Sequence, residues 1–365
     1  MSSVIAQAPV RPQSPSSVKL HYIQALRGLA ATLVLFDHIL TTLIKYGDIP
    51  ASYAPLFARL GGVGVSIFFV ISGFIMMHME GEGGHAPQAA RTFLLKRIIR
   101  IAPVYWLATA LSFVLLVLVK KPEPPIYLAK SLLFIPYFSS VEQAMYPVVA
   151  QGWTLNYEMV FYLAFAAAMM APGRLGFLAL TALFGALAAL GATGIFGPTG
   201  NVGATVMGFY ADPIILLFPI GMGVALAQRR WPRLFENSYP MLVAIGLVAL
   251  DIMIFANASL HENALATLTT FAISIASVGV CAMHGGQPVG WSSRLWEMLG
   301  DSSYSLYLFH TLVLAVLNRT LDAHGLWRAG LYISTAFIVA TGVAYAIYGF
   351  IEKPVTERLR RSLLA

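Results

Sequence analysis

The sequence predicts an all-α membrane protein, a polytopic bundle of about ten transmembrane helices. Apolar residues make up 58% of the 365-residue chain and charged residues only 11%, whereas a soluble domain carries roughly 25% charged residues. The charged residues cluster in short runs between apolar stretches, many of which approach the roughly 20 residues that a helix needs to cross a bilayer. Most of this chain therefore does not face water.

The two ends of the chain differ in composition from its centre. Residues 1–19 are polar and rich in Pro and Ser, and neither an apolar core nor a small-residue cleavage pattern follows them. We expect a disordered cytoplasmic tail here rather than a cleaved signal peptide. Residues 20–357 contain no short internal repeat and no long linker, which predicts one membrane domain, and residues 358–365 form a second cytoplasmic tail.

Ten apolar runs are long enough, or nearly so, to cross the membrane as helices. They lie near residues 22–44, 60–79, 98–119, 153–171, 176–195, 213–228, 240–256, 264–283, 298–317 and 331–351. A further apolar stretch, 126–139, is short for a span and contains Lys130 and Pro136. We expect it to form an interfacial or re-entrant segment on the outer side.

Basic residues orient this bundle. With the N-terminus inside, the outer loops hold seven of the 23 Lys and Arg residues: Lys45, Arg59, Lys120, Lys121, Lys130, Arg319 and Arg328. The others lie in the tails and inner loops, so the positive-inside rule places both termini in the cytoplasm. The net charge of +7 then reflects topology and anionic lipid headgroups rather than a nucleic-acid partner.

Ionisable side chains within the predicted spans point to a functional site, because a charge in the bilayer is costly. Arg27 and His38 share one face of the first span, about 16 Å apart along its axis. Glu158 in the fourth span and His310 in the ninth are expected at a depth similar to that of His38, in the outer half. Each could instead be a buried polar residue bonded to a neighbouring helix, but His38 and Glu158 at one depth favour function.

Two aspartates within the predicted spans are expected to be structural. Asp37 points about 100° away from its neighbour His38 around the helix axis. Asp251, in the seventh span, has no evident partner in the sequence.

The start of the third span and the whole of the second carry weaker signals. Arg97 and Arg100 are three residues apart on one helix face, where they form either an ordinary positive-inside anchor or a pair of guanidinium forks for phosphate. Residues 61–74 include several small residues, among them Ser72 and Gly73. Small residues in a span usually indicate close helix packing, and no Walker-type phosphate loop is present.

Taken together, these motifs resemble the acyltransferase-3 family of membrane-bound acyltransferases, in order and in spacing, from about residue 20 to residue 357. The resemblance rests on Arg-x10-His in the first span, GVGVSIFFVISGF in the second, Arg-x-x-Arg opening the third, QGWTLNYEMVFY (151–162), GDSSYSLYLFH (300–310) and the closing IEKP (351–354). Each motif alone is weak, but the ordered set is specific. The chain looks most like short single-domain members that acetylate exopolysaccharide.

The resemblance implies transfer of an acyl group, usually acetyl, across the bacterial inner membrane. The donor would be cytoplasmic acyl-CoA (acetyl-CoA), and the acceptor a hydroxyl of an extracytoplasmic or lipid-linked saccharide. The phosphates of coenzyme A need basic groups at the inner face, for which Arg27, Arg97 and Arg100 are the candidates, and Ser72 and Gly73 are further candidates for donor binding. We expect no permanently bound cofactor and no metal.

A saccharide hydroxyl is a poor nucleophile near neutral pH and needs a general base within hydrogen-bond reach. His38 is the candidate base, and Glu158 the candidate partner that fixes its tautomer and stabilises the imidazolium, as in hydrolase triads. A transient acyl-imidazole on His38 is the alternative.

Four residues are candidates for binding the acceptor. Trp153, at the expected outer mouth beside Glu158, is a candidate sugar platform, although an interfacial aromatic anchor explains it equally well. Tyr304, Tyr307 and His310 follow one another at intervals of three residues and line the same cavity if they are not simply core residues.

Two other functions remain open. A proton-coupled secondary transporter also carries intramembrane His and Glu, although we find no inverted repeat and no helices broken by Gly or Pro at matched positions. An acyltransferase that acts on a small molecule such as a macrolide is the second alternative. The sequence identifies neither the acceptor nor the acyl chain.

Overall fold

The structure is a computed structural model that describes residues 20–80, 86–119, 121, 123–139, 142–255, 264–284, 291–320 and 326–364. Over these residues it is helical and contains no strand, only an isolated bridge between Ser139 and Ala144. The all-α prediction is therefore confirmed. The tail predicted for residues 1–19 lies outside the described residues.

The helices follow the apolar runs of the sequence closely. They are α1 (His21–Lys45), α2 (Ala54–Glu80), α3 (Pro87–Leu118), α4 (Pro125–Leu132), α5 (Trp153–Met170), α6 (Leu175–Ala192), α7 (Val206–Tyr210), α8 (Leu217–Arg230), α9 (Pro240–Ile254), α10 (Ala264–Ala282), α11 (Trp291–Asp301), α12 (Ser303–Thr320), α13 (Leu326–Ile347) and α14 (Lys353–Leu364). The 3-10 turns η3 (Ala150–Gly152) and η5 (Pro213–Leu216) precede α5 and α8, and a π-helix, η7 (Tyr348–Glu352), joins α13 to α14.

Six helical segments of the described chain are long and apolar enough to cross a membrane: α1, α2, α3, α6, α10 and the continuous segment Ala329–Leu364. The other predicted spans correspond to α5, α8, α9 and α12, which have 18, 14, 15 and 18 residues. The chain is thus a membrane protein by the length and composition of its helices. The count of ten spans and the cytoplasmic placement of both termini stay predictions.

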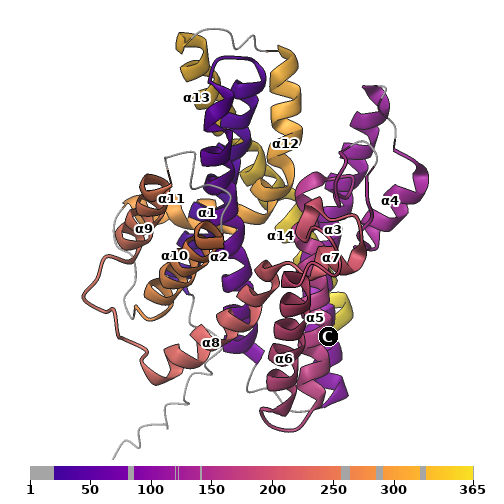
Figure 1. Cartoon of the computed structure of the whole chain (residues 1–365), viewed down its shortest axis with the longest axis vertical. Helices are drawn as coiled ribbons and strands as arrows, with labels where there is room; N and C mark the ends of the chain where they lie inside the picture. The colour runs from indigo at the N-terminus through magenta and orange to yellow at the C-terminus, as the bar shows by residue number, and fades with distance from the viewer. Residues whose placement is uncertain are drawn as a thin grey trace, which may run out of the picture.

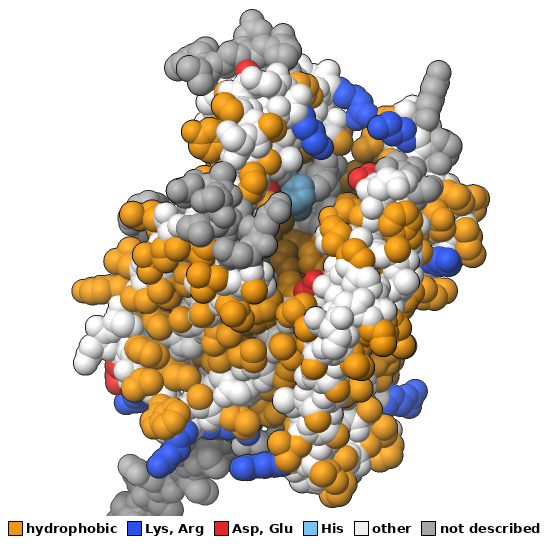
Figure 2. Space-filling view, viewed as in Figure 1, with side chains coloured by type: hydrophobic (Ala, Val, Ile, Leu, Met, Phe, Trp, Pro, Cys, Tyr) orange, Lys and Arg blue, Asp and Glu red, His pale blue; other side chains and the backbone are white. Residues whose placement is uncertain are grey.

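Helix α1 runs through the middle of the molecule (Figure 1). It packs most extensively against α2, with α8 to α11 on one side and α3, α5 and α6 on the other. Its C-terminal part forms a second, smaller core with α12 and α13, which project together at the top of the view. Figure 2 shows a largely apolar surface with a hollow between this upper part and the rest, and a histidine side chain is visible in the hollow.

Glycines in α2 allow the neighbouring helices to approach closely. A Cβ atom added to Gly64 would lie 2.5 Å from the Ala30 carbonyl oxygen of α1. A Cβ at Gly73 would lie 2.0 Å from the Phe218 carbonyl oxygen of α8. The close helix packing that residues 61–74 predict is therefore present, and it fixes α2 against both neighbours.

A buried ion pair ties α2 to α9. The Arg59 guanidinium donates to both carboxylate oxygens of Asp251, at 3.1 Å from Nε and 2.8 Å from Nη2, and also to the Ala266 carbonyl and the Thr270 hydroxyl of α10. Its Cζ lies 3.9 Å from the centroid of the Phe255 ring. The structural role predicted for Asp251 is confirmed, whereas the assignment of Arg59 to an outer loop is wrong, because α2 begins at Ala54 and carries this arginine into the bundle.

The segment between α3 and α5 does not form a helix that could cross the membrane. Helix α4 has only eight residues, and the described chain between it and α5 is irregular apart from the short η3 turn. At its end Gln151 is 5% exposed and donates to the Leu308 carbonyl at 2.7 Å and to the Thr311 hydroxyl at 2.9 Å. Because this segment enters the bundle and contacts α12, α5 begins inside the protein.

Candidate active site

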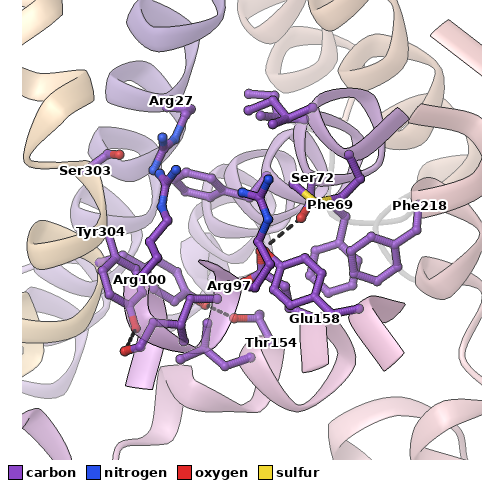
Figure 3. A pocket seen from close by; sticks show the side chains of 18 of the residues that line it. Arg27, Phe69, Ser72, Arg97, Arg100, Thr154, Glu158, Phe218, Ser303 and Tyr304 are labelled. Atoms are coloured by element: carbon purple, nitrogen blue, oxygen red, sulfur yellow. Dashed lines mark hydrogen bonds between the residues drawn. The ribbon is translucent and has the colours of Figure 1, made fainter. Parts of the chain in front are cut away.

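A cavity opens between α1, α2, α3, α5 and α12, with a volume of about 790 Å³ that includes the open space at its mouth (Figure 3). Apolar side chains such as Phe69 and Phe218 line part of it. Its polar wall residues are Arg27, Ser72, Arg97, Arg100, Thr154, Glu158, Tyr162, Ser303, Tyr304 and Tyr307. Seven residues singled out from the sequence therefore lie in one place: the three arginines, Ser72, Glu158, Tyr304 and Tyr307.

The three arginines come from two helices. Arg27 projects from α1, while Arg97 and Arg100 share one face of α3, a turn apart. Figure 3 shows the guanidinium groups of Arg27 and Arg100 next to each other, with Arg97 extending toward Ser72. Each arginine is half-buried. Both side chains of the Arg97–Arg100 pair point into the bundle, where they line the cavity.

Glu158 is the only acidic residue among those that line the cavity. Its Oε1 accepts a hydrogen bond of 2.9 Å from the Ser72 hydroxyl and a second from the Tyr162 hydroxyl. Its negative charge also lies within electrostatic range of Arg27. Glu158 thus shares the cavity with the arginines, and no hydrogen bond joins it to His38 in the described part of the chain.

The depth expected for Glu158 is wrong, and the register of α5 against α12 shows why. Gln151 contacts Leu308 and Thr311, the neighbours of His310, and one turn further along α5 Thr154 lies 2.8 Å from the Tyr307 hydroxyl. Glu158 follows another turn on, about 10 Å along the axis from Gln151. Because α5 begins inside the protein, Glu158 lies deeper than His310 rather than level with it.

His38 and His310 form a pair of their own. Their rings meet edge to face, with centroids 4.8 Å apart and planes at 78°. His38 Nδ1 lies 2.9 Å from the Val34 carbonyl oxygen, and His310 Nδ1 lies 3.0 Å from the Leu306 carbonyl oxygen. A carbonyl oxygen only accepts hydrogen bonds, so each Nδ1 carries a proton, and in the neutral form of either ring Nε2 has a free lone pair.

Asp37 lies closer to this pair than its position on the helix suggested. Its Oδ2 is 3.5 Å from His38 Nδ1, and its Oδ1 accepts a hydrogen bond of 3.3 Å from the Thr41 hydroxyl. The separation of about 100° around the helix axis describes the directions in which Asp37 and His38 leave the helix. Their side chains are nevertheless long enough to turn toward each other. A carboxylate is therefore present beside His38, but it is Asp37 and not Glu158.

Two tyrosines of α12 connect the cavity with the histidine pair. Tyr304 donates to the Ile101 carbonyl at 2.8 Å and Tyr307 to the Gln151 carbonyl at 2.9 Å. The Tyr307 ring centroid lies 6.4 Å from that of His310. One face of α12 thus presents Tyr304, Tyr307 and His310 in succession, from the arginine cavity toward His38.

Besides His38 and His310, two further candidate residues lie outside the cavity wall. Gly73 faces the α8 backbone, where its role is close packing. Trp153 is half-buried, and its ring packs against that of Tyr157 with centroids 5.8 Å apart. The structure therefore does not bring either residue to the arginines.

One residue near the site was missed from the sequence. Glu352 is 8% exposed, accepts a hydrogen bond of 2.6 Å from the Ser305 hydroxyl, and lies within electrostatic range of Arg100 and Arg27. It belongs to the closing IEKP motif, which was quoted without a role. The π-helix η7 turns this carboxylate inward, and sequence periodicity does not indicate such a helix.

Comparison with known proteins identifies the family of the chain. The sequence profile described as an acyltransferase domain matches residues 20–349, so the chain belongs to the acyltransferase-3 family and is an acyltransferase of the membrane. It is similar to the exopolysaccharide production protein ExoZ of Rhizobium meliloti (strain 1021), with 34% identity over 310 residues, 82% of this chain and 91% of ExoZ. No solved structure matches the chain significantly.

Proposed function

We propose that this enzyme moves an acetyl or another short acyl group from cytoplasmic acyl-CoA to a hydroxyl of an extracytoplasmic or lipid-linked saccharide, in the bacterial inner membrane. The observation that carries the proposal is the convergence of Arg27, Arg97 and Arg100 in one cavity, whose wall includes Tyr307, the neighbour of the histidine pair. The similarity to ExoZ, whose name states a part in exopolysaccharide production, supports a saccharide as acceptor.

The charge of the cavity supports a phosphate-bearing donor. Three arginines and one glutamate line it, and Glu352 adds a second carboxylate nearby, which leaves a positive balance for an anionic ligand. Arginine forks bind phosphate in a bidentate manner, and coenzyme A carries several phosphates. Glu158 is held by Ser72 and Tyr162, and its carboxylate lies within electrostatic range of Arg27.

The distance between the arginines and the histidines suits a long donor. Arg27 and His38 are separated by about 16 Å along α1, and Tyr304 and Tyr307 line the face of α12 between those two depths. The pantetheine arm would extend along this face and bring the thioester to the histidine pair, which the acceptor reaches from the outside. The His38 side chain, 39% exposed, is accessible to both substrates.

The chemistry then requires one proton transfer in each direction. His38 Nε2, the basic nitrogen, takes the proton of the acceptor hydroxyl as the oxygen attacks the thioester carbonyl carbon. The C–O bond forms, the C–S bond breaks, and the proton passes from Nε2 to the departing thiolate. The Val34 carbonyl fixes the tautomer, and the Asp37 carboxylate, 3.5 Å from Nδ1, stabilises the imidazolium in between.

Donor binding tests the first half of the proposal. Arg97→Ala or Arg100→Ala should weaken acyl-CoA binding by about 1.5–3 kcal/mol each, because each removes a charge-assisted hydrogen bond to phosphate. Binding is measured by titration calorimetry with purified protein. Arg91→Ala is the matched control, since Arg91 lies on the same helix but is exposed and outside the cavity wall. Unchanged donor affinity together with reduced acceptor use would contradict the phosphate assignment.

Transfer from labelled acetyl-CoA to a defined glycan by purified protein tests the second half. His38→Ala should abolish measurable transfer while acyl-CoA still binds, because a positioned general base contributes about 10² to 10⁴ in rate. Label that stays on wild-type protein without acceptor would indicate an acyl-imidazole on His38 instead of direct transfer. Label on a small hydroxylated compound but on no glycan would place the acceptor in another class.

A further inference from the structure

The contact between His38 and His310 leaves one polar atom without an evident purpose. His310 is 1% exposed, and its Nε2 has no hydrogen-bond partner in the described part of the chain. Its Nδ1 is bonded to the Leu306 carbonyl, so Nε2 is an acceptor and not a donor. A buried acceptor without a partner is destabilising, and a phenylalanine would fill the same space without this cost.

The same atom has a suitable partner at one stage of the reaction. When His38 takes the acceptor's proton, its Nε2 changes from a lone pair into an N–H donor. The His310 ring lies against the His38 ring, with centroids 4.8 Å apart, a separation at which a ring nitrogen of one histidine can come within hydrogen-bond distance of the other. The titratable groups that contact the His38 ring are Asp37 from α1 on the Nδ1 side and the neutral His310 from α12.

We propose that His310 is a positioning residue for acyl transfer, whose neutral Nε2 accepts a hydrogen bond from the Nε2–H of the His38 imidazolium. This inference rests on the proposed function, in which His38 is the general base. His310 gains and loses no proton. It stabilises the imidazolium between the two proton transfers, after the proton has left the acceptor hydroxyl and before it moves to the thiolate.

The test compares variants that remove or keep the acceptor atom. His310→Phe keeps the ring and its bulk but removes the nitrogen, so kcat should fall about 10- to 150-fold, the range of a hydrogen bond to a charged group, with KM for both substrates unchanged. The ascending limb of the pH–kcat profile should move to lower pH, because the imidazolium loses a stabilising partner and His38 stays neutral in more acidic solution. His310→Gln, whose amide oxygen accepts a hydrogen bond, should restore part of kcat and should move the ascending limb part of the way back toward its wild-type position.

The chain offers a matched control. His284 also meets an aromatic ring edge to face, with its centroid 4.7 Å from that of Tyr22, and its Nδ1 lies 2.8 Å from the Phe235 carbonyl oxygen. His284→Phe should leave kcat and the pH limb as in wild type. His310→Met, which is apolar and flexible, repeats the test if the Phe variant does not accumulate.

The outcomes separate the inference from the function on which it rests. If His38→Ala is inactive while His310→Phe or His310→Met turns over at the wild-type rate with the wild-type pH limb, only the inference is overturned. The inference is also overturned if kcat of the His310 variants falls while the ascending limb of the pH–kcat profile stays in place, since that result indicates a structural role for His310. If His38→Ala retains full transfer, the proposed general base itself is wrong.

Discussion

Arg59 and Asp251 meet in the interior of the bundle, with exposed side-chain fractions of 8% and 0%. Breaking a buried ion pair from one side leaves an uncompensated charge, which typically costs 3–5 kcal/mol. We expect Arg59→Ala to lower the free energy of unfolding by about this amount, measured by thermal unfolding in detergent. The double variant Arg59→Met with Asp251→Leu should recover most of the loss, because it removes both charges together.

A surface pair provides the control for that experiment. Arg361 and Glu357 lie 3.8 Å apart on α14, with exposed side-chain fractions of 83% and 51%. Exposed pairs of this kind contribute at most about 1 kcal/mol. Glu357→Ala should therefore leave stability nearly unchanged. If Arg59→Ala also left the free energy of unfolding unchanged, the Arg59–Asp251 pair would not hold α2 against α9 and α10.

At the residue scale the sequence was a good guide to which polar side chains lie at the site or in the interior. It was a poor guide to the partners of those side chains. Arg27, Arg97 and Arg100 were recognised as a set and do line one cavity. Asp251 had no evident partner because Arg59 is 192 residues away. Partners of this kind depend on which helices pack together, and spacing along one helix carries no information about that.

Helix packing at Gly73 can be tested against its predicted role in donor binding. A Cβ at this position would lie 2.0 Å from the Phe218 carbonyl oxygen, so Gly73→Ala must push α2 away from α8. Overpacking of this kind costs about 1–3 kcal/mol. We expect a lower unfolding temperature and a loss of transfer that follows the loss of folded protein, with acyl-CoA affinity unchanged in the fraction that remains folded.

Gly62 on the same helix is the matched position, because a Cβ there would meet nothing within 4 Å. Gly62→Ala should therefore keep the wild-type unfolding temperature. A Gly73→Ala protein with normal stability but weakened acyl-CoA binding would instead restore Gly73 to the donor site.

At the element scale the apolar runs predicted where helices occur but not how deep each one lies. The run near 153–171 matches α5 closely, yet Glu158 lies about 10 Å deeper than Gln151, which is itself already inside the bundle. The reason is the irregular segment that ends at η3, because it occupies the outer part of the bundle before α5 begins. A similar limit applies to α3, which begins at Pro87, well before the apolar run near 98–119.

The topology of the whole molecule can be measured with the single cysteine as background. Cys281 is 3% exposed, so labelling of the wild-type protein by a membrane-impermeant thiol reagent should be low. Arg174→Cys lies in the connection from α5 to α6, expected inside, and Ile195→Cys follows α6, expected outside. In intact cells we expect labelling at residue 195 and none at residue 174 until the membrane is opened.

A reporter fused after Ala365 tests the same topology from the end of the chain. The distribution of basic residues predicts a cytoplasmic C-terminus, so a reporter that is active only in the cytoplasm should be active there. An extracytoplasmic reporter would contradict the topology. It would also place the Arg27 end of the cavity on the wrong side for a cytoplasmic donor.

At the scale of the whole molecule, composition was sufficient to predict an all-α membrane protein, and the ordered motifs were sufficient to predict its family. Neither predicted that α1 would join two cores, or that a hollow would lie between the part that it shares with α12 and α13 and the rest. These features arise from contacts between distant segments. They determine where the histidine pair and the arginine cavity lie relative to each other.

The Arg59–Asp251 pair also bears on how the protein is made. Its two members are 192 residues apart, and at a synthesis rate of about 5–20 residues per second the arginine precedes the aspartate by roughly 10 to 40 s. During that interval α2 is inserted with a charge that has no partner. Arg59 lies only five residues from the start of α2, so its long side chain can reach the aqueous boundary while it waits. We therefore expect α2 to reach its final position only after α9 has been inserted, when Asp251 pairs with Arg59.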